Sequence, residues 1–200
     1  MKKIGIMGGT FDPIHIGHLL IAEYARISFK LDKILFIPTG NPPHKKKKHI
    51  TSDMHRYNMV LLATNSNENF LLSTIEMDRK GVTYTIDTIN ALKSIYDNTD
   101  FYFIMGADSL LQIYSWKDYE KLLNMCKFIV AKRPGYKDNK LDEVKSDLNL
   151  KYNSQIFIME GPLLDISSSQ IRERVKKGIS ITYLVPRAVE IYIYKHKLYS

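Results

Sequence analysis

The chain contains a single cysteine, Cys126, among its 200 residues. One thiol excludes an intramolecular disulfide framework of the kind that stabilises small secreted domains. The apolar run near the amino end, Ile4 to Met7, is short and is interrupted by Gly5, so it does not have the form of a secretory signal. No uninterrupted apolar stretch is long enough to cross a bilayer. We therefore expect a soluble, cytoplasmic protein that has no membrane partner.

The sequence also lacks a Pro/Ser/Gly-rich linker and an internal repeat. With 44% hydrophobic residues, the chain is long enough to bury a substantial core. We therefore expect one domain that spans residues 1–200.

Acidic residues are in the minority: 21 Asp and Glu stand against 29 Lys and Arg, which gives a formal net charge of +8. This balance indicates an anionic partner but does not choose between mononucleotides, polyphosphates and nucleic acid. In the densest basic run, Lys45 to Lys48, the residues Lys46 to Lys48 are typical of a solvated loop. Because no RNA-binding module motif or aromatic-basic repeat accompanies the charge, we expect no nucleic-acid partner.

Short apolar runs alternate with polar or amphipathic segments along the chain. The runs are 4–7, 34–37, 70–73, 101–105, 128–131 and 156–159. This alternation is typical of helices that cross over between parallel strands, and near-continuous apolar strands indicate burial on both faces. We predict an α/β fold, a Rossmann-like three-layer sandwich with a mainly parallel sheet. Helices are expected from about residue 15, after residues 52, 85, 116 and 168, and around 141–148 and 186–197.

The most specific local signal is the sequence GGTFDPIHIGH at residues 8–18, directly after the first apolar run. A glycine-rich turn before a helix start can bind phosphate, because the first backbone N–H groups have no partner within the helix and the helix dipole adds partial positive charge there. His15 and His18, three residues apart, share one helical face at that pole. An apolar stripe predicts that the helix packs on the core; it consists of Ile16, Leu19, Leu20, Ala22 and Ile27.

Plainer interpretations of the same loop remain open. The glycines also suit a tight turn, and the histidines suit a helix cap or an exposed surface. Metal ligation by the two histidines is disfavoured, because neither a cysteine nor an adjacent carboxylate completes a ligand set. The loop lacks the Lys-Ser/Thr ending of a P-loop and the three-glycine spacing of a dinucleotide fingerprint, so neither motif accounts for it.

Several other segments are expected at the same edge of the sheet as this loop. In an open parallel sheet, ligands bind beyond the carboxyl ends of the strands, where the connections diverge to opposite faces. The segments that follow the later predicted strands are 38–45, 106–108, Arg133 and 167–172. Ser167 and Gln170 have the spacing of a capping box, so the serine run predicts a well-started helix and, compatibly, an anion site.

The residues 8–18 resemble the signature of the nucleotidyltransferases that share their fold with class I aminoacyl-tRNA synthetases, and most closely the bacterial nicotinate mononucleotide adenylyltransferases. The agreement continues through Asn41-Pro42-Pro43-His44-Lys45, RKGVTYTIDT at 79–88, Gly106-Ala107-Asp108-Ser109 with Trp116, Lys132-Arg133-Pro134-Gly135, and Ile166-Ser167-Ser168-Ser169-Gln170-Ile171-Arg172. The resemblance covers nearly the whole chain. It implies adenylyl transfer from ATP to nicotinate mononucleotide, which gives deamido-NAD and pyrophosphate in NAD biosynthesis. Mg²⁺ bound to the ATP phosphates would serve as cofactor. Whether the protein forms a homo-oligomer stays open.

The resemblance also implies roles for individual residues. It assigns catalysis to His15, His18, Lys45 and Arg172. It assigns ATP binding to Gly8, Gly9, Thr10, Phe11, Gly17, Gly106, Asp108, Ile166, Ser167, Ser168 and Ser169, with the C-terminal helical part, about 166–200, completing the site. It assigns the acceptor nucleotide to Asn41, Thr85, Trp116, Lys117 and Arg133, and it implies no protein-ligated metal. Ser169 departs from the threonine that is common in the family, but the hydroxyl is retained.

Alternatives remain at this stage. Trp116 also suits an ordinary core position, Asn41 a turn, Asp108 a helix cap and Arg133 an exposed site. Rival substrates are nicotinamide mononucleotide and phosphopantetheine, although the phosphopantetheine enzymes characteristically have threonine where this chain has His15. A noncatalytic nucleotide-binding or RNA-binding module is the alternative from a different class.

Overall fold

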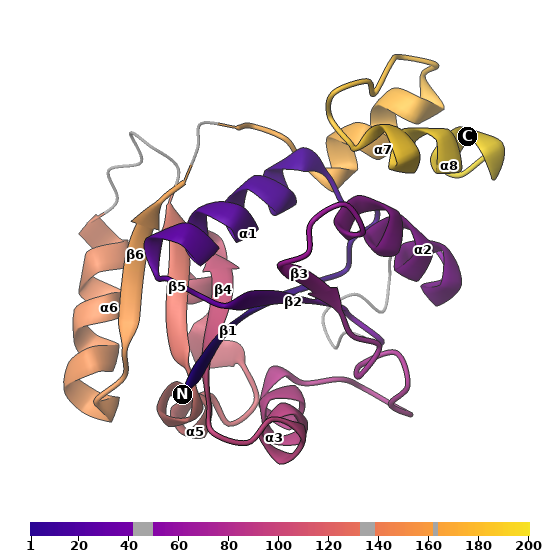
Figure 1. The fold of residues 1–200 in the computed structure, drawn as a ribbon. Helices are drawn as coiled ribbons and strands as arrows, with labels where there is room; N and C mark the ends of the chain where they lie inside the picture. The colour runs from indigo at the N-terminus through magenta and orange to yellow at the C-terminus, as the bar shows by residue number, and fades with distance from the viewer. Residues whose placement is uncertain (42–49, 133–138, 162–163) are drawn as a thin grey trace.

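A six-stranded parallel sheet forms the centre of the structure, a computed structural model that describes residues 1–41, 50–132, 139–161 and 164–200 (Figure 1). The strand order is β3-β2-β1-β4-β5-β6, and every neighbouring pair is parallel. The strands are β1 (Lys2–Gly9), β2 (Lys33–Pro38), β3 (Phe70–Leu72), β4 (Thr99–Gly106), β5 (Lys127–Lys132) and β6 (Ile156–Glu160). All six lie where the apolar runs predicted them.

Helices cover both faces of this sheet, which confirms the predicted three-layer α/β sandwich (Figure 1). One layer contains α1 (Ile16–Ser28), α2 (Asp53–Thr64), α7 (Ser168–Lys176) and α8 (Arg187–Lys195). The other contains α3 (Thr85–Ile95), α4 (Ala107–Leu111), the 3₁₀ turn η2 (Ile113–Ser115), α5 (Tyr119–Met125) and α6 (Asn139–Tyr152). The sequence patterns did not predict α4 and η2, which are only five and three residues long.

The strands have apolar side chains on both faces because a helical layer covers each face. In β2, Ile34 and Phe36 belong to the core cluster under α1 and α2, whereas Leu35 and Ile37 belong to the cluster under α3 to α6. All four side chains are at most 2% exposed. The two-residue period of a strand therefore divides one continuous apolar run between two cores.

One prediction for α1 is wrong. Ile27 was expected in the apolar stripe that packs on the core, but its side chain is 62% exposed. Ala22 and Ala25 are instead fully buried, and the helix ends one residue after Ile27. Ile27 follows the buried Ala25 by two residues, about 200° around the helix, so its side chain points away from the core.

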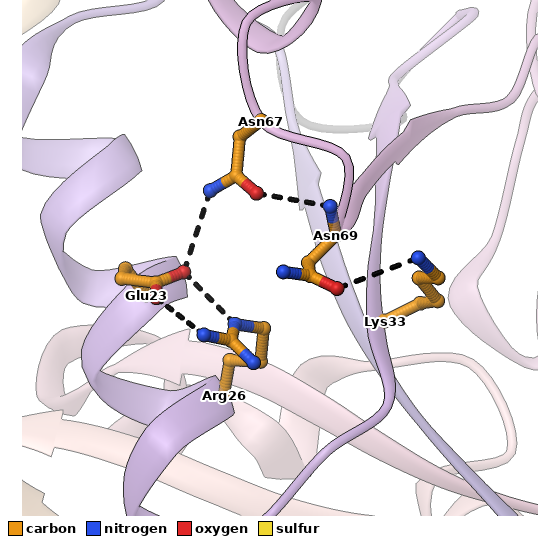
Figure 2. A network of polar contacts seen from close by, with 5 residues as sticks. All are labelled: Glu23, Arg26, Lys33, Asn67 and Asn69. Carbon is orange, nitrogen blue, oxygen red and sulfur yellow. Dashed lines mark hydrogen bonds and ion pairs between the residues drawn. The ribbon is translucent and has the colours of Figure 1, made fainter.

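The outer side of α1 is tied to the edge of the sheet by polar contacts (Figure 2). The Glu23 carboxylate accepts hydrogen bonds from Arg26 at 2.6 and 3.0 Å and from the Asn67 amide at 3.5 Å. Asn69 donates its backbone N–H to Asn67 at 2.9 Å, and Lys33 of β2 donates to the Asn69 side chain at 3.4 Å. These half-buried contacts connect α1 to the turn before β3 and to β2, so they orient the helix whose first turn faces the site.

Across the described ranges, no helix combines the length and the apolar character that a membrane span requires.

Candidate active site

At the carboxyl edge of the sheet, the connections that leave β1 and β4 run in opposite directions. The connection after β1 leads to β2 on one side, whereas β4 leads to β5 on the other, and ligands bind in parallel sheets at such a switch point. Two clefts open at this edge. We call them the tryptophan cleft, of about 480 Å³, which Trp116 lines, and the serine cleft, of about 560 Å³, which Ser167 and Ser168 line.

The two clefts meet. They share four lining residues, which are His18, Ile21, Gly106 and Ala131. The predicted site residues in the tryptophan cleft are Gly8, Gly9, Thr10, His18, Thr85, Gly106, Trp116 and Lys117. Those in the serine cleft are His15, Gly17, His18, Gly106, Asp108, Ile166, Ser167 and Ser168. The convergence expected at the ends of the strands is therefore present, and His18 lies where a ligand in one cleft would reach a ligand in the other.

His15 and His18 form a stacked pair at the start of α1. His15 is the N-cap residue, and its backbone N–H donates to Nδ1 of His18 at 3.2 Å. The two imidazole rings are 3.6 Å apart between centroids and 27° from parallel. Because Nδ1 of His18 accepts a hydrogen bond, a neutral His18 carries its proton on Nε2. The pair therefore offers an N–H donor rather than a lone pair at that nitrogen.

Burial keeps both imidazoles neutral at neutral pH. It lowers the pKa of His15 from 6.5 to about 4, and it lowers the pKa of His18 well below the ordinary value, with a further contribution from the charge of His15. Desolvation disfavours the charged form of a histidine, and two stacked imidazolium ions would also repel each other. In the ligand-free protein the two rings act as polar, uncharged groups.

The neighbours of this pair pack closely against it. A Cβ on Gly17 would lie 3.1 Å from Nδ1 of His15, which is closer than ordinary van der Waals contact. The Phe11 ring packs edge-on against His18, with 5.1 Å between centroids. Phe11 itself is buried and is not among the residues that line either cleft. The structure thus places the Phe11 ring against His18, outside the lining of the two clefts.

Side chains from other elements hold the backbone of the loop between β1 and α1. Arg56 of α2, which is 1% exposed, donates to the carbonyl of Thr10 at 2.8 Å and to that of Thr39 at 2.7 Å. Arg172 of α7 donates to the carbonyl of Asp12 at 2.7 Å. Ser168 donates its hydroxyl to the carbonyl of Pro13 at 2.8 Å. The loop is therefore fixed from two sides, and Arg172 lies beside it, outside the residues that line the clefts.

The start of α7 is the second helix N-terminus at the site. Ser167 caps the helix: its hydroxyl accepts the backbone N–H of Gln170 at 3.3 Å, and its own N–H donates to the Gln170 side chain at 2.9 Å. This capping box is the one that the spacing predicted. The Ser169 hydroxyl lies 3.3 Å from that of Ser167. Two helix N-termini, α1 and α7, thus meet at the serine cleft and favour an anion there.

The wall of the tryptophan cleft comes from η2 and α3. Trp116 is half-buried and packs against the edge of Phe103, with 5.9 Å between centroids and an interplanar angle of 88°. Thr85 is the first residue of α3. The Lys117 ammonium lies 3.3 Å from the Asp87 carboxylate and 4.5 Å from the centroid of the Tyr84 ring. Trp116 is therefore partly core and partly cleft wall, which reconciles the two interpretations of this residue.

Other predicted residues lie elsewhere. Asn41 lines a third hollow of about 360 Å³ that it shares with Arg56 and Arg79, and its carbonyl accepts the backbone N–H of Thr83 at 3.0 Å. Lys45 and Arg133 lie outside the described residues. In the part of the chain that the structure describes, no group of three or more His, Cys, Asp and Glu side chains has an arrangement that could hold a metal ion.

The sequence reasoning missed several lining residues. In the tryptophan cleft these are Thr39, Glu76, Thr83, Thr88 and Gln112, and in the serine cleft Lys132, Gly161 and Leu164. Lys132 directly precedes the predicted Arg133 and ends β5, so its position after a strand was a usable signal. Glu76 carried no such signal. Burial raises the pKa of its carboxyl, whose Oε1 accepts the Thr88 hydroxyl at 2.8 Å.

The strand order and the two joined clefts at the switch point define a nucleotide-binding α/β protein. Residues 6–174 match the Cytidylyltransferase-like family. A protein of Thermoanaerobacter sp. (strain X514), named Probable nicotinate-nucleotide adenylyltransferase, is 53% identical over 99% of this chain and 94% of its own length. A protein of the same name from Moorella thermoacetica is 49% identical over 98% of this chain and 91% of its own length.

Solved structures agree with these relatives. Plasmodium falciparum nicotinic acid mononucleotide adenylyltransferase complexed with NaAD is 26% identical and has a TM-score of 0.80, over 100% of this chain and 98% of that chain. The same protein complexed with APC has a TM-score of 0.78 at 25% identity, over the same shares of the two chains. The chain belongs to the Cytidylyltransferase-like family and, within it, to the nicotinate-nucleotide adenylyltransferases.

Proposed function

We propose that this protein transfers the adenylyl group of ATP to nicotinate mononucleotide, giving deamido-NAD (nicotinate adenine dinucleotide) and pyrophosphate in NAD biosynthesis. The observation that carries the proposal is the meeting of two clefts at His18, because a transfer between two nucleotides needs two adjoining sites. The names of the full-length relatives supply the substrates.

ATP would occupy the serine cleft. Its triphosphate would lie against the first turns of α1 and α7, where backbone N–H groups, the dipoles of both helices and the hydroxyls of Ser167 and Ser168 favour negative charge. Gly17 permits the close approach of His15 to the start of α1, and Gly106 and Asp108, which line the same cleft, would face the sugar. On this proposal residues 166–200 complete the ATP site of a single domain that spans residues 1–200.

Nicotinate mononucleotide would occupy the tryptophan cleft. The exposed part of the Trp116 ring offers an apolar plane for the pyridine ring. The Thr85 hydroxyl and the Lys117 backbone N–H would donate to the nicotinate carboxylate. The Lys117 ammonium pairs with Asp87 in the first turn of α3, the turn that Thr85 begins, so the two donors would come from adjoining elements.

The reaction needs positioning more than covalent chemistry. The acceptor phosphate is already anionic, so no general base is required, and the site must align it with the α-phosphorus of ATP and stabilise the charge that develops on the pyrophosphate. His18 would donate from Nε2 to a phosphate oxygen at the junction of the clefts, and His15 would hold the neighbouring phosphates. A bound polyphosphate favours the imidazolium form, so binding would raise both histidine pKa values from their lowered state.

Mg²⁺ is the proposed cofactor and would neutralise phosphate charge in the transition state. Because the described residues offer no ligand group of their own, it would bind through the ATP phosphate oxygens. Lys45 and Arg172 would stabilise the pyrophosphate, and Arg133 would meet the acceptor phosphate. Asn41 would contact the acceptor from the neighbouring hollow.

Pyrophosphate release tests this proposal. The protein is mixed with ATP, Mg²⁺ and either nicotinate mononucleotide or nicotinamide mononucleotide. Release with nicotinate mononucleotide supports the proposal. Faster release with nicotinamide mononucleotide would show that this nucleotide is the substrate instead. RNA binding without pyrophosphate release would show a binding module rather than an enzyme. His18→Ala should lower turnover at saturating substrates by about 100-fold or more while the protein stays folded, whereas His196→Ala, at an exposed position, should not.

A further inference from the structure

The buried carboxylate of Asp12 joins the loop after β1 to the carboxyl end of the chain. Asp12 is 5% exposed. Its Oδ1 accepts the hydroxyl of Tyr199 at 2.7 Å, and its Oδ2 accepts the backbone N–H of Thr51 at 3.3 Å. A buried carboxylate is stable only where such donors replace water.

Tyr199 is the penultimate residue, and it is anchored in place. Its hydroxyl lies 3.9 Å from the sulfur of Met59 in α2, and Leu198 before it donates its N–H to the carbonyl of Ile193 at 3.0 Å. Burial and the Asp12 charge raise the pKa of Tyr199, so the phenol keeps its proton and donates it to the carboxylate. The terminal segment is therefore packed between α2 and the loop.

Asp12 lies three residues before His15, within the loop that the other contacts already hold. Arg56 holds the carbonyl of Thr10, and Arg172 holds the carbonyl of Asp12. These contacts act on the backbone, whereas Tyr199 and Thr51 act on the Asp12 side chain. A loop fixed through its carbonyls and through a side chain keeps its first helical N–H groups and the histidine pair in one orientation.

We propose that Tyr199 is a positioning residue for the ATP site. Its hydroxyl fixes Asp12, and through Asp12 it fixes the turn that presents His15 and His18 to the serine cleft. Tyr199 touches neither cleft, so it acts only through the loop. The inference rests on the proposed function for the identity of the ligand. The contacts of Tyr199 and Asp12 do not depend on that function.

Replacing Tyr199 by phenylalanine removes the hydroxyl and keeps the ring. We expect kcat/KM for ATP to fall by about 10-fold, as for the loss of a hydrogen bond to a charged group, with KM for nicotinate mononucleotide within about 2-fold of the wild type. Mg-ATP affinity, measured by calorimetry without acceptor, should fall in parallel. Tyr194→Phe is the matched control, since Tyr194 lies in α8, directly before the terminal segment, and is 48% exposed; all its constants should equal those of the wild type.

A double-mutant cycle with Asp12→Asn separates positioning from stability. If Tyr199 acts through Asp12, the effects of the two substitutions on kcat/KM for ATP are not additive. Additive effects, or wild-type constants for folded Tyr199→Phe, overturn the proposal. Should Tyr199→Phe be unfolded at the assay temperature, the cycle is run at a lower temperature at which the unfolding curve shows the folded state. If the wild-type protein binds Mg-ATP but releases no pyrophosphate, only the proposed function is contradicted. The double-mutant cycle can then be measured on the affinity for Mg-ATP, and it still tests Tyr199.

Discussion

The stacked histidines should make the protein sensitive to mild acid. His15 titrates at about pH 4 in the folded protein and near 6.5 when the chain is unfolded. Between these values the unfolded state binds more protons than the folded state, so the free energy of unfolding rises with pH across this window and falls as the solution is acidified. His18, whose pKa is also lowered, acts in the same direction.

The magnitude follows from the His15 shift. A shift of one pKa unit corresponds to about 1.4 kcal/mol, so the full depression of His15 corresponds to about 3 kcal/mol, of which about 2 kcal/mol is lost between about pH 7.5 and about pH 5. Compared with a total stability of about 5–15 kcal/mol, this loss is measurable. Glu76 acts in the opposite direction, because its raised pKa adds stability in acid, and the comparison must therefore be made between variants.

Urea unfolding at about pH 7.5 and about pH 5 measures this difference. In His15→Asn the loss of stability on acidification should be smaller than in the wild type by about 2 kcal/mol. His196→Asn, which also removes a histidine but at an exposed position, should keep the wild-type dependence. An equal loss of stability in the wild type and in His15→Asn would refute the reasoning, because the burial of His15 would then carry no proton linkage.

Three further substitutions test the packing of the site. Gly40→Ala should lower the free energy of unfolding by about 2 kcal/mol or more in urea unfolding, because a Cβ there would lie 2.2 Å from the backbone oxygen of Glu76. Gly17→Ala should raise KM for ATP several-fold in steady-state assays with little loss of stability, because the new methyl group presses on the His15 ring. Trp116→Leu should raise KM for nicotinate mononucleotide by about 10-fold and leave KM for ATP unchanged, since the lost stacking surface lines only the tryptophan cleft.

The fold followed from the sequence because its main signals are local. Six apolar runs marked six strands, and the capping box of Ser167 and Gln170 marked the start of α7. The short helix α4 was missed because five residues carry too little periodicity. Ile27 was misplaced because it lies two residues after the buried Ala25, on the opposite side of the helix from the face that packs on the core.

The site could be predicted from the sequence only in part. The glycine loop, the histidine pair and the serine run follow strands, so the topology alone brings them together. Glu76 and Gln112 line the tryptophan cleft through tertiary packing that no sequence spacing records. The contact of Arg172 could not be predicted either. Its position in α7 was clear, but its hydrogen bond to the Asp12 carbonyl depends on a loop 160 residues away.

Among the described residues, few positively charged side chains line the clefts. Of the residues that the structure describes along the two clefts, the lysines are Lys117, which is paired with Asp87, and Lys132, and arginine is absent. Arg56 and Arg172 direct their donors to loop carbonyls instead. On the proposed function, the described lining of the clefts would meet a polyphosphate mainly with oriented N–H groups and imidazoles, which need little reorganisation as negative charge moves from the attacking acceptor phosphate to the leaving pyrophosphate. On the proposed function, a net charge of +8 would attract the nucleotides to the protein, whereas fixed dipoles at the junction of the clefts would align them.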